Sequence, residues 1–132
     1  MRCFTITKVK KVNDVSWNEI VIEAKKPVFV MFYSPSCPHC QNIKPYVEKY
    51  AEEYEKTVLF AQINIAENQI IASNYSVMGT PTFLFFCKGK PVSSIVGAVY
   101  PALLKKTIED GIQFGEDCRS KTTWIDPNTG YA

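Results

Sequence analysis

Short runs of apolar residues recur along the first hundred positions and alternate with segments of helical period. Three of these runs, at residues 28–33, 58–65 and 82–87, are mostly apolar. A run of this kind is typical of a strand that is covered on both faces of a sheet. Two further strand candidates lie at 9–12 and 91–96, and the tight turn Lys88-Gly89-Lys90 makes 91–96 the hairpin partner of 82–87. The pattern therefore predicts five strands.

Between the strands, apolar residues return at steps of three and four, which predicts helices. In the longest such segment Ile43, Val47 and Tyr50 follow this spacing, and Pro45 is expected to kink the helix because it lacks an N–H donor. Pro101 opens the last helix, which is expected to end at Gly111. The helices are expected at 16–24, 37–54, 67–75 and 101–111. Strands that alternate with helices and then form a hairpin describe an α/β domain with a mixed central sheet.

The domain is expected to occupy residues 1–111, with roughly the first eight residues as an arm or an extra strand. Residues 112–132 are polar and rich in turn-forming residues, and are expected to form a short C-terminal extension. The chain of 132 residues is long enough to bury one core, and its 46% apolar and 21% charged residues are ordinary for a globular protein.

Charge and cysteine content bear on partners and location. The net charge is +2 and no basic cluster stands out, so we expect neither a nucleic-acid binder nor a membrane-surface binder. No run approaches the ~18 to 20 apolar residues of a membrane span, and the N-terminus does not read as a secretory signal. An odd number of cysteines, five, fits a reducing compartment better than a disulfide-stapled protein. We therefore expect a cytoplasmic protein, and a monomer.

Two cysteines, Cys37 and Cys40, lie where the apolar run 28–33 gives way to a helix. A Cys-x-x-Cys sequence in this context indicates a redox pair, because the two sulfurs can close a small disulfide at a helix start. The helix N-terminus supplies N–H groups and a partial positive charge that stabilise a thiolate on Cys37. Cys37 is therefore the expected nucleophile, exposed and acidic, and Cys40 is the expected resolving thiol.

Residues 9–111 resemble the thioredoxin family, because they contain four motifs in the order in which the family carries them. The first is the Cys-x-x-Cys with Pro45 following in its helix, and the second is Val77-Met78-Gly79-Thr80-Pro81-Thr82-Phe83, which is similar to the family's cis-proline segment. The hairpin Lys88-Gly89-Lys90 and the glycine loop Val96-Gly97-Ala98 complete the set. The resemblance implies a thioredoxin fold, in which helices flank both faces of a central mixed sheet.

The resemblance also implies a substrate site. Pro81 would be cis and would lie beside the two cysteines, so that the backbone of Thr80 could pair with an extended substrate segment. Gly97 would belong to the same site. The redox-active disulfide Cys37–Cys40 would need no cofactor, and the partners would be disulfide-containing proteins and a reductase or another recycling thiol system. On its own, Gly79-Thr80-Pro81 is also compatible with an ordinary turn before a strand.

Near the cysteines the sequence departs from ordinary thioredoxins at the dipeptide Pro38-His39, where thioredoxin has Gly-Pro, and at Ser36, where a tryptophan usually stands. An N–H or imidazolium of His39 close to the Cys37 sulfur would stabilise its thiolate, and so make the disulfide more oxidising. The other interpretation of His39 is a solvated residue at a helix start. Ser36 changes the surface on which a reductase would dock.

A further departure lies in the strands. Met31 stands where thioredoxins carry a buried aspartate, and Gln62 stands where they carry the lysine opposite it. Neither residue can manage the proton of Cys40, so a water or another group would have to accept it. We expect slower resolution of mixed disulfides than in an ordinary thioredoxin, although Met31 is also simply a good core residue.

Three cysteines remain outside the pair. Cys87 ends an apolar run and is expected to be a buried, structural residue. Cys3 and Cys118 lie near the termini and could form a second disulfide, although the sequence alone cannot fix a connectivity. We expect no metal, because there is no second Cys-x-x-Cys to complete a ligand set, and no hydrolase triad.

Two functions follow from these observations. The first is a thiol–disulfide oxidoreductase, chiefly a cytoplasmic disulfide reductase, that acts on protein substrates through Cys37 and Cys40. The alternative is a thioredoxin-like binding module or chaperone that uses the cis-proline groove with little redox turnover, which Met31 and Ser36 favour.

Overall fold

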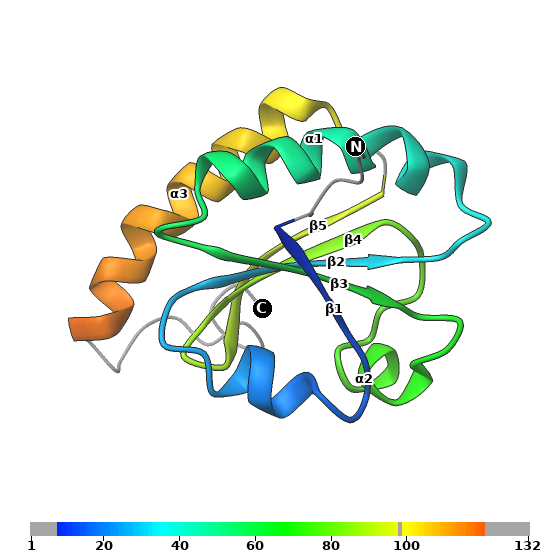
Figure 1. Cartoon of the computed structure of the whole chain (residues 1–132), viewed down its shortest axis with the longest axis horizontal. Coiled ribbons are helices and arrows are strands. Elements are labelled where there is room, and N and C mark those ends of the chain that lie inside the picture. The colour runs from blue at the N-terminus through cyan, green and yellow to red at the C-terminus, as the bar shows by residue number, and fades with distance from the viewer. Residues whose placement is uncertain (1–7, 98, 121–132) are drawn as a thin grey trace, which may run out of the picture.

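The computed structural model describes residues 8–97 and 99–120, and a five-stranded mixed sheet lies at its centre (Figure 1). The spatial order of the strands is β1-β3-β2-β4-β5. β1 and β2 run parallel to β3, whereas β4 is antiparallel to β2 and to β5. The predicted strands are confirmed, to within a residue at each end; their bounds are Val9–Val12 for β1, Val28–Tyr33 for β2, Leu59–Asn64 for β3, Thr82–Cys87 for β4 and Lys90–Val96 for β5.

Helices cover both faces of the sheet, as expected (Figure 1). Two longer helices, α1 (Pro38–Glu53) and α3 (Pro101–Ser120), lie over one face. The short π-helical turn η1 (Asn18–Ile22) and α2 (Gln69–Asn74) lie over the other. The predicted α/β class and thioredoxin fold are therefore confirmed.

Alternate residues of each buried strand face opposite cores, because successive side chains of a strand point to opposite sides of the sheet. On β2, Phe29 and Met31 pack in the core under α1 and α3, whereas Val28, Val30 and Phe32 pack in the core over η1 and α2. Both sets are at most 2% exposed, which explains why this strand reads as an unbroken apolar run. Burial of each large side chain stabilises the fold by about 1.5–3 kcal/mol.

The predicted end of the last helix at Gly111 is wrong, because α3 continues to Ser120. A Cβ atom on Gly111 would lie 2.6 Å from two atoms of the Phe85 ring, and Phe85 is only 1% exposed. Glycine therefore stands here to let α3 approach β4 closely, and it does not end the helix. Nine residues of the predicted extension belong to α3, whereas residues 121–132 and the expected arm at 1–7 lie outside the described residues.

Candidate active site

Cys37 is the N-cap residue of α1. Its backbone is extended, with φ −89° and ψ 113°, and Pro38 follows at the start of the helix, where a missing N–H group costs nothing. The Cys37 sulfur takes the place of the usual capping oxygen, because it accepts a hydrogen bond from the Cys40 N–H at 3.2 Å. The capping geometry thus directs a helix N–H group, and the positive end of the helix dipole, at the sulfur of Cys37.

The loop before β4 lies against this sulfur. The Thr80–Pro81 peptide bond is cis, and the Cys37 thiol donates a hydrogen bond to the Thr80 carbonyl at 3.4 Å. Gly97, at the end of β5, donates its N–H to the Pro81 carbonyl at 2.8 Å and has a φ of +92°, a conformation that favours glycine. The structure therefore brings together Cys37, Thr80, Pro81 and Gly97, four predicted site residues from three separate segments.

The two thiols have different acidities. Burial would raise the pKa of Cys37, but hydrogen bonds from the side chains of Cys40 and Thr80 and from the backbones of Cys40 and His39 outweigh it, so the pKa of Cys37 is lowered. Burial, together with the hydrogen bond to Cys37, raises the pKa of Cys40 to about 11. Cys37 is therefore the more acidic of the two thiols and forms a thiolate more readily than Cys40. The expectation that Cys37 is exposed is wrong, because only 9% of it is accessible, against 3% of Cys40.

His39 acts on Cys37 through its main chain. Its backbone is among the groups that lower the pKa of Cys37, while its side chain points into solvent. Within the described ranges the imidazole makes no hydrogen bond and no ion pair. Of the two interpretations of His39, the geometry favours the solvated side chain, with the electrostatic contribution coming from the backbone N–H.

A cavity of about 270 Å³ opens beside Cys40. Met31 and Gln62, paired across β2 and β3, line it, and they are 2% and 5% exposed. Lys11 of β1 and Lys44 of α1 line it as well, and none of the described residues around it carries a carboxyl group. Lys11 and Lys44 were missed by sequence reasoning, because only the register of three neighbouring strands places Lys11 beside Gln62.

Exposed apolar side chains lie next to the two loops that the Gly97–Pro81 hydrogen bond joins. Met78 precedes the Gly79-Thr80-Pro81 loop and is 93% exposed, and Val96 precedes Gly97 and is 70% exposed. Sequence reasoning used both residues only as motif positions. The available signal was an apolar residue placed directly before a glycine at each loop. Large exposed apolar side chains of this kind are typical of a surface that binds another chain.

The other cysteines differ from expectation. Cys87 is buried, as predicted, but it is disulfide-bonded rather than a free structural thiol. Cys37 and Cys40 are both free thiols, and a second disulfide between Cys3 and Cys118 stays a prediction. Both lie outside the residues whose side chains are described.

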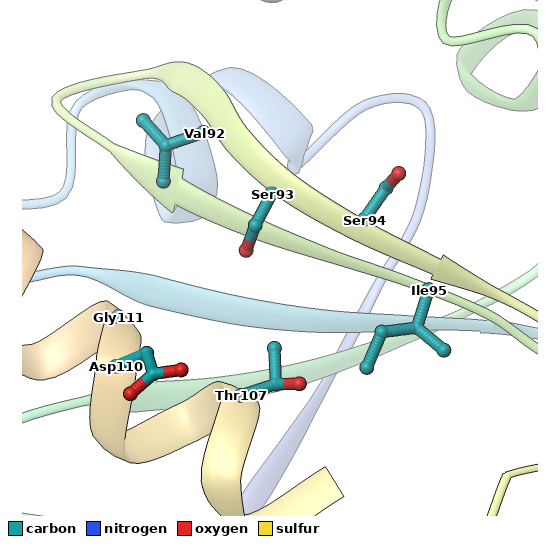
Figure 2. A pocket seen from close by; sticks show the side chains of 7 residues that line it. All are labelled: Val92, Ser93, Ser94, Ile95, Thr107, Asp110 and Gly111. Atoms are coloured by element: carbon teal, nitrogen blue, oxygen red, sulfur yellow. The ribbon is translucent and has the colours of Figure 1, made fainter. Parts of the chain in front are cut away.

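A second hollow, of about 340 Å³, lies between β5 and α3 (Figure 2). The side chains of Ser93 and Ile95 from β5 and of Thr107 and Asp110 from α3 surround it, and none of the predicted site residues lines it.

Residues 8–97 and 99–120 contain no group of three or more potential metal ligands. In the same ranges no helix is long and apolar enough to cross a membrane.

A mixed α/β sheet with a Cys-x-x-Cys capping its first long helix, beside a cis-proline loop, defines the class of thioredoxin-fold proteins with a dithiol site. Comparison with known proteins supports the same class. The sequence model of the Thioredoxin family matches residues 8–110. This chain belongs to the thioredoxin family.

Individual relatives are similar over most of the chain. The chloroplastic M-type thioredoxin of Spinacia oleracea is 38% identical over 104 residues, which are 79% of this chain and 58% of that protein. The thioredoxin of Porphyra purpurea is 36% identical over 76% of this chain and 94% of its own length. The thioredoxin of Synechocystis is 35% identical over 75% of this chain and 92% of its own length. This chain thus spans less than two thirds of the spinach protein.

The expectation of a cytoplasmic location is wrong. Four matching relatives, the spinach protein among them, are chloroplastic M-type thioredoxins, and red algal and cyanobacterial thioredoxins match as well. The cytoplasm was inferred from an odd number of cysteines. That count bears on a reducing compartment and does not by itself select the cytoplasm.

Proposed function

We propose that this protein is a thiol–disulfide oxidoreductase that reduces disulfides in protein substrates through Cys37 and Cys40. The observation that carries the proposal is the position of the Cys37 sulfur, which caps α1 and lies beside the cis-proline loop. A thiolate is the nucleophile in disulfide exchange, and the lowered pKa of Cys37 favours it. Membership of the thioredoxin family supports the same reaction class.

The reaction has two exchange steps. The Cys37 thiolate attacks one sulfur of the substrate disulfide, which forms a mixed disulfide and releases the other substrate sulfur as a thiolate. Cys40 then loses its proton and attacks the Cys37 sulfur. This forms the Cys37–Cys40 disulfide, breaks the mixed disulfide and releases the second substrate sulfur. Two electrons pass from the protein to the substrate, and no other cofactor is required.

Thr80, Pro81 and Gly97 would hold the substrate. An extended segment laid along the Thr80 backbone would present its disulfide to Cys37, whose sulfur is 3.4 Å from the Thr80 carbonyl. The exposed side chains of Met78 and Val96 supply apolar contacts on either side. Contacts made mainly by backbone and apolar groups suit substrates of varied sequence.

Reduction of insulin disulfides, with dithiothreitol as the electron source, tests the proposal. The unmodified protein is expected to speed the precipitation of the insulin B chain, and Cys37→Ser is expected to abolish this effect. Cys40→Ser is expected instead to accumulate a mixed disulfide, visible as an added mass on Cys37. Full activity of Cys37→Ser, with its fold verified by circular dichroism, would overturn the mechanism.

We also place the protein in a chloroplast-type setting, with a reductase or another thiol system that reduces the Cys37–Cys40 disulfide. The names of four relatives support the location. Ser36, exposed beside Cys37 in place of the usual tryptophan, alters the surface that such a reductase would meet. Fractionation of the source cells, followed by immunodetection of the protein, tests the location.

The second candidate is a binding module that uses the same groove with little turnover. The observation in its favour is the absence of a carboxylate beside Cys40 among the described residues that line its cavity, because the resolving step then lacks an obvious base. Insulin reduction and oxidation of a dithiol peptide separate the two candidates. If neither is detectable while a peptide still binds, the binding module is the better account.

A further inference from the structure

The cavity beside Cys40 contains a buried polar group that none of the described residues satisfies. The Gln62 side chain is 5% exposed, and within the described part of the chain its amide makes no hydrogen bond. A buried amide without a partner is costly, so such groups usually bind ordered water or a ligand. The cavity, about 270 Å³, is roomy enough for several water molecules, each of which needs about 30 Å³.

The strand register explains why these groups meet. Lys11 pairs with Gln62, and Gln62 pairs with Met31, so the three residues form one row across β1, β3 and β2. The row lies on the face under α1, from which Cys40 and Lys44 complete the wall of the cavity. Lys11, Lys44 and Gln62 therefore line the same cavity as the buried thiol of Cys40.

We infer that this cavity holds water that accepts the Cys40 proton, that Gln62 positions this water, and that Lys11 and Lys44 stabilise the thiolate that forms. The inference rests on the proposed function, because it concerns its second exchange step. The proton moves from the Cys40 sulfur to a cavity water and on to solvent. The sulfur keeps the electron pair, with which it attacks Cys37. Lys11 and Lys44 act through their electric field rather than as bases.

The other titratable groups around Cys40 do not supply this charge. Tyr33 of β2 also lines the cavity, and burial, with the nearby Glu67, raises the pKa of its phenol, so it stays neutral near pH 8. Cys37 is part of the mixed disulfide when Cys40 reacts, and then carries no charge. Lys11 and Lys44 are thus the charged groups among the described residues that line the cavity.

The resolving step can be measured separately with Ellman's reagent. Attack by Cys37 releases one nitrothiobenzoate, and attack by Cys40 on the mixed disulfide releases a second, so stopped-flow absorbance shows two phases. The signal of Cys37→Ser is subtracted to remove any other thiol. The rate of the second phase is then recorded from pH 6 to 10 for the unmodified protein, Lys11→Met, Lys44→Met, the double variant and Gln62→Met.

Each lysine substitution is expected to slow the second phase about two- to fivefold in this range, the effect below the midpoint of a Cys40 pKa raised by about 0.3 to 0.7 units, and the double variant by roughly the product of the two. The effect should shrink in high salt. Gln62→Met is expected to slow the second phase several-fold at every pH, and the first phase should change little in all of them. Lys10→Met is the matched control, because its neighbour Lys11 lines the cavity whereas Lys10 does not.

An unchanged rate of the second phase in both lysine variants and in their double variant would overturn the inference, even if Gln62→Met failed to fold. Failure of the proposed function would look different, because neither phase would then appear in the unmodified protein. Two phases in the unmodified protein, with a second-phase rate that the lysine substitutions do not change, would leave the oxidoreductase standing and remove the roles of Lys11 and Lys44.

Discussion

At the scale of single residues, the sulfur of Cys37 makes two hydrogen bonds that fix its position. Cys37 caps α1 by accepting the Cys40 N–H, and the same sulfur reaches the Thr80 carbonyl across the site. A helix cap is a conformationally fixed position, so the nucleophile is held in place before a substrate arrives. The Cys-x-x-Cys spacing predicts this arrangement from sequence, because Cys40 is the residue whose N–H a cap at Cys37 can reach. The limited exposure of Cys37 depends on the distant cis-proline loop and could not be predicted.

The first prediction concerns the acidity of Cys37. Its alkylation by iodoacetamide is expected to rise with pH through a midpoint below the ~8.5 of an ordinary cysteine, because hydrogen bonds stabilise the thiolate. Thr80→Val removes the hydroxyl among these donors and should move the midpoint up by about half a unit. Cys40 does not interfere, since its pKa of about 11 keeps it protonated in this range.

Thr80→Ser is the matched control for that measurement. It keeps a hydroxyl at the same position, so its midpoint should stay close to that of the unmodified protein. Alkylation is read by mass spectrometry of the Cys37 peptide, which separates this thiol from others. Equal midpoints for Thr80→Val and Thr80→Ser would show that the Thr80 hydroxyl does not act on Cys37.

At the scale of elements, the strands could be predicted better than the last helix. The runs 28–33 and 82–87 coincide with β2 and β4, because strands buried on both faces leave an apolar run in the sequence. The end of α3 could not be read the same way. In the sequence, Gly111 resembles a residue that ends a helix. A glycine is needed there because the Phe85 ring on β4, which is distant in sequence, leaves no room for a Cβ atom. A local sequence pattern does not predict the end of a helix where a contact with a distant segment determines the residue type.

Replacement of Gly111 tests this explanation. Gly111→Ala should lower the free energy of unfolding by about 1–2 kcal/mol in urea titrations. The clash with the buried Phe85 ring costs about 1–3 kcal/mol, and the better helix propensity of alanine offsets up to about 1 kcal/mol of it. A stabilised Gly111→Ala protein would contradict the close packing of α3 on β4.

Gly79→Ala serves as the comparison, because a Cβ there would have no atom within 4 Å and Gly79 is not among the residues of positive φ. Its free energy of unfolding should stay within about 0.5 kcal/mol of the unmodified protein. The difference between the two variants then isolates the contact with Phe85 from the general effect of replacing a glycine.

At the scale of the whole molecule, the sheet order assembles the site from distant segments. Placing β2 between β3 and β4 brings the start of α1 next to the loop before β4, and placing β1 beside β3 brings Lys11 to the cavity. The thiol pair and the cis-proline loop could be predicted because each leaves a local motif. Lys11 could not, since only the parallel register places it beside Gln62, and Lys44 of α1 belongs to none of the motifs.

The reduction potential of the Cys37–Cys40 pair, measured by equilibration against glutathione buffers and acid quenching, tests the central claim most directly. The claim is a dithiol that reduces protein disulfides, and the predicted value lies near or below about −250 mV, in the range of thioredoxin-like reductants. A value above about −200 mV would contradict it, since the pair would then drive oxidation or isomerisation. A pair that forms no disulfide at any glutathione ratio would contradict the redox function altogether.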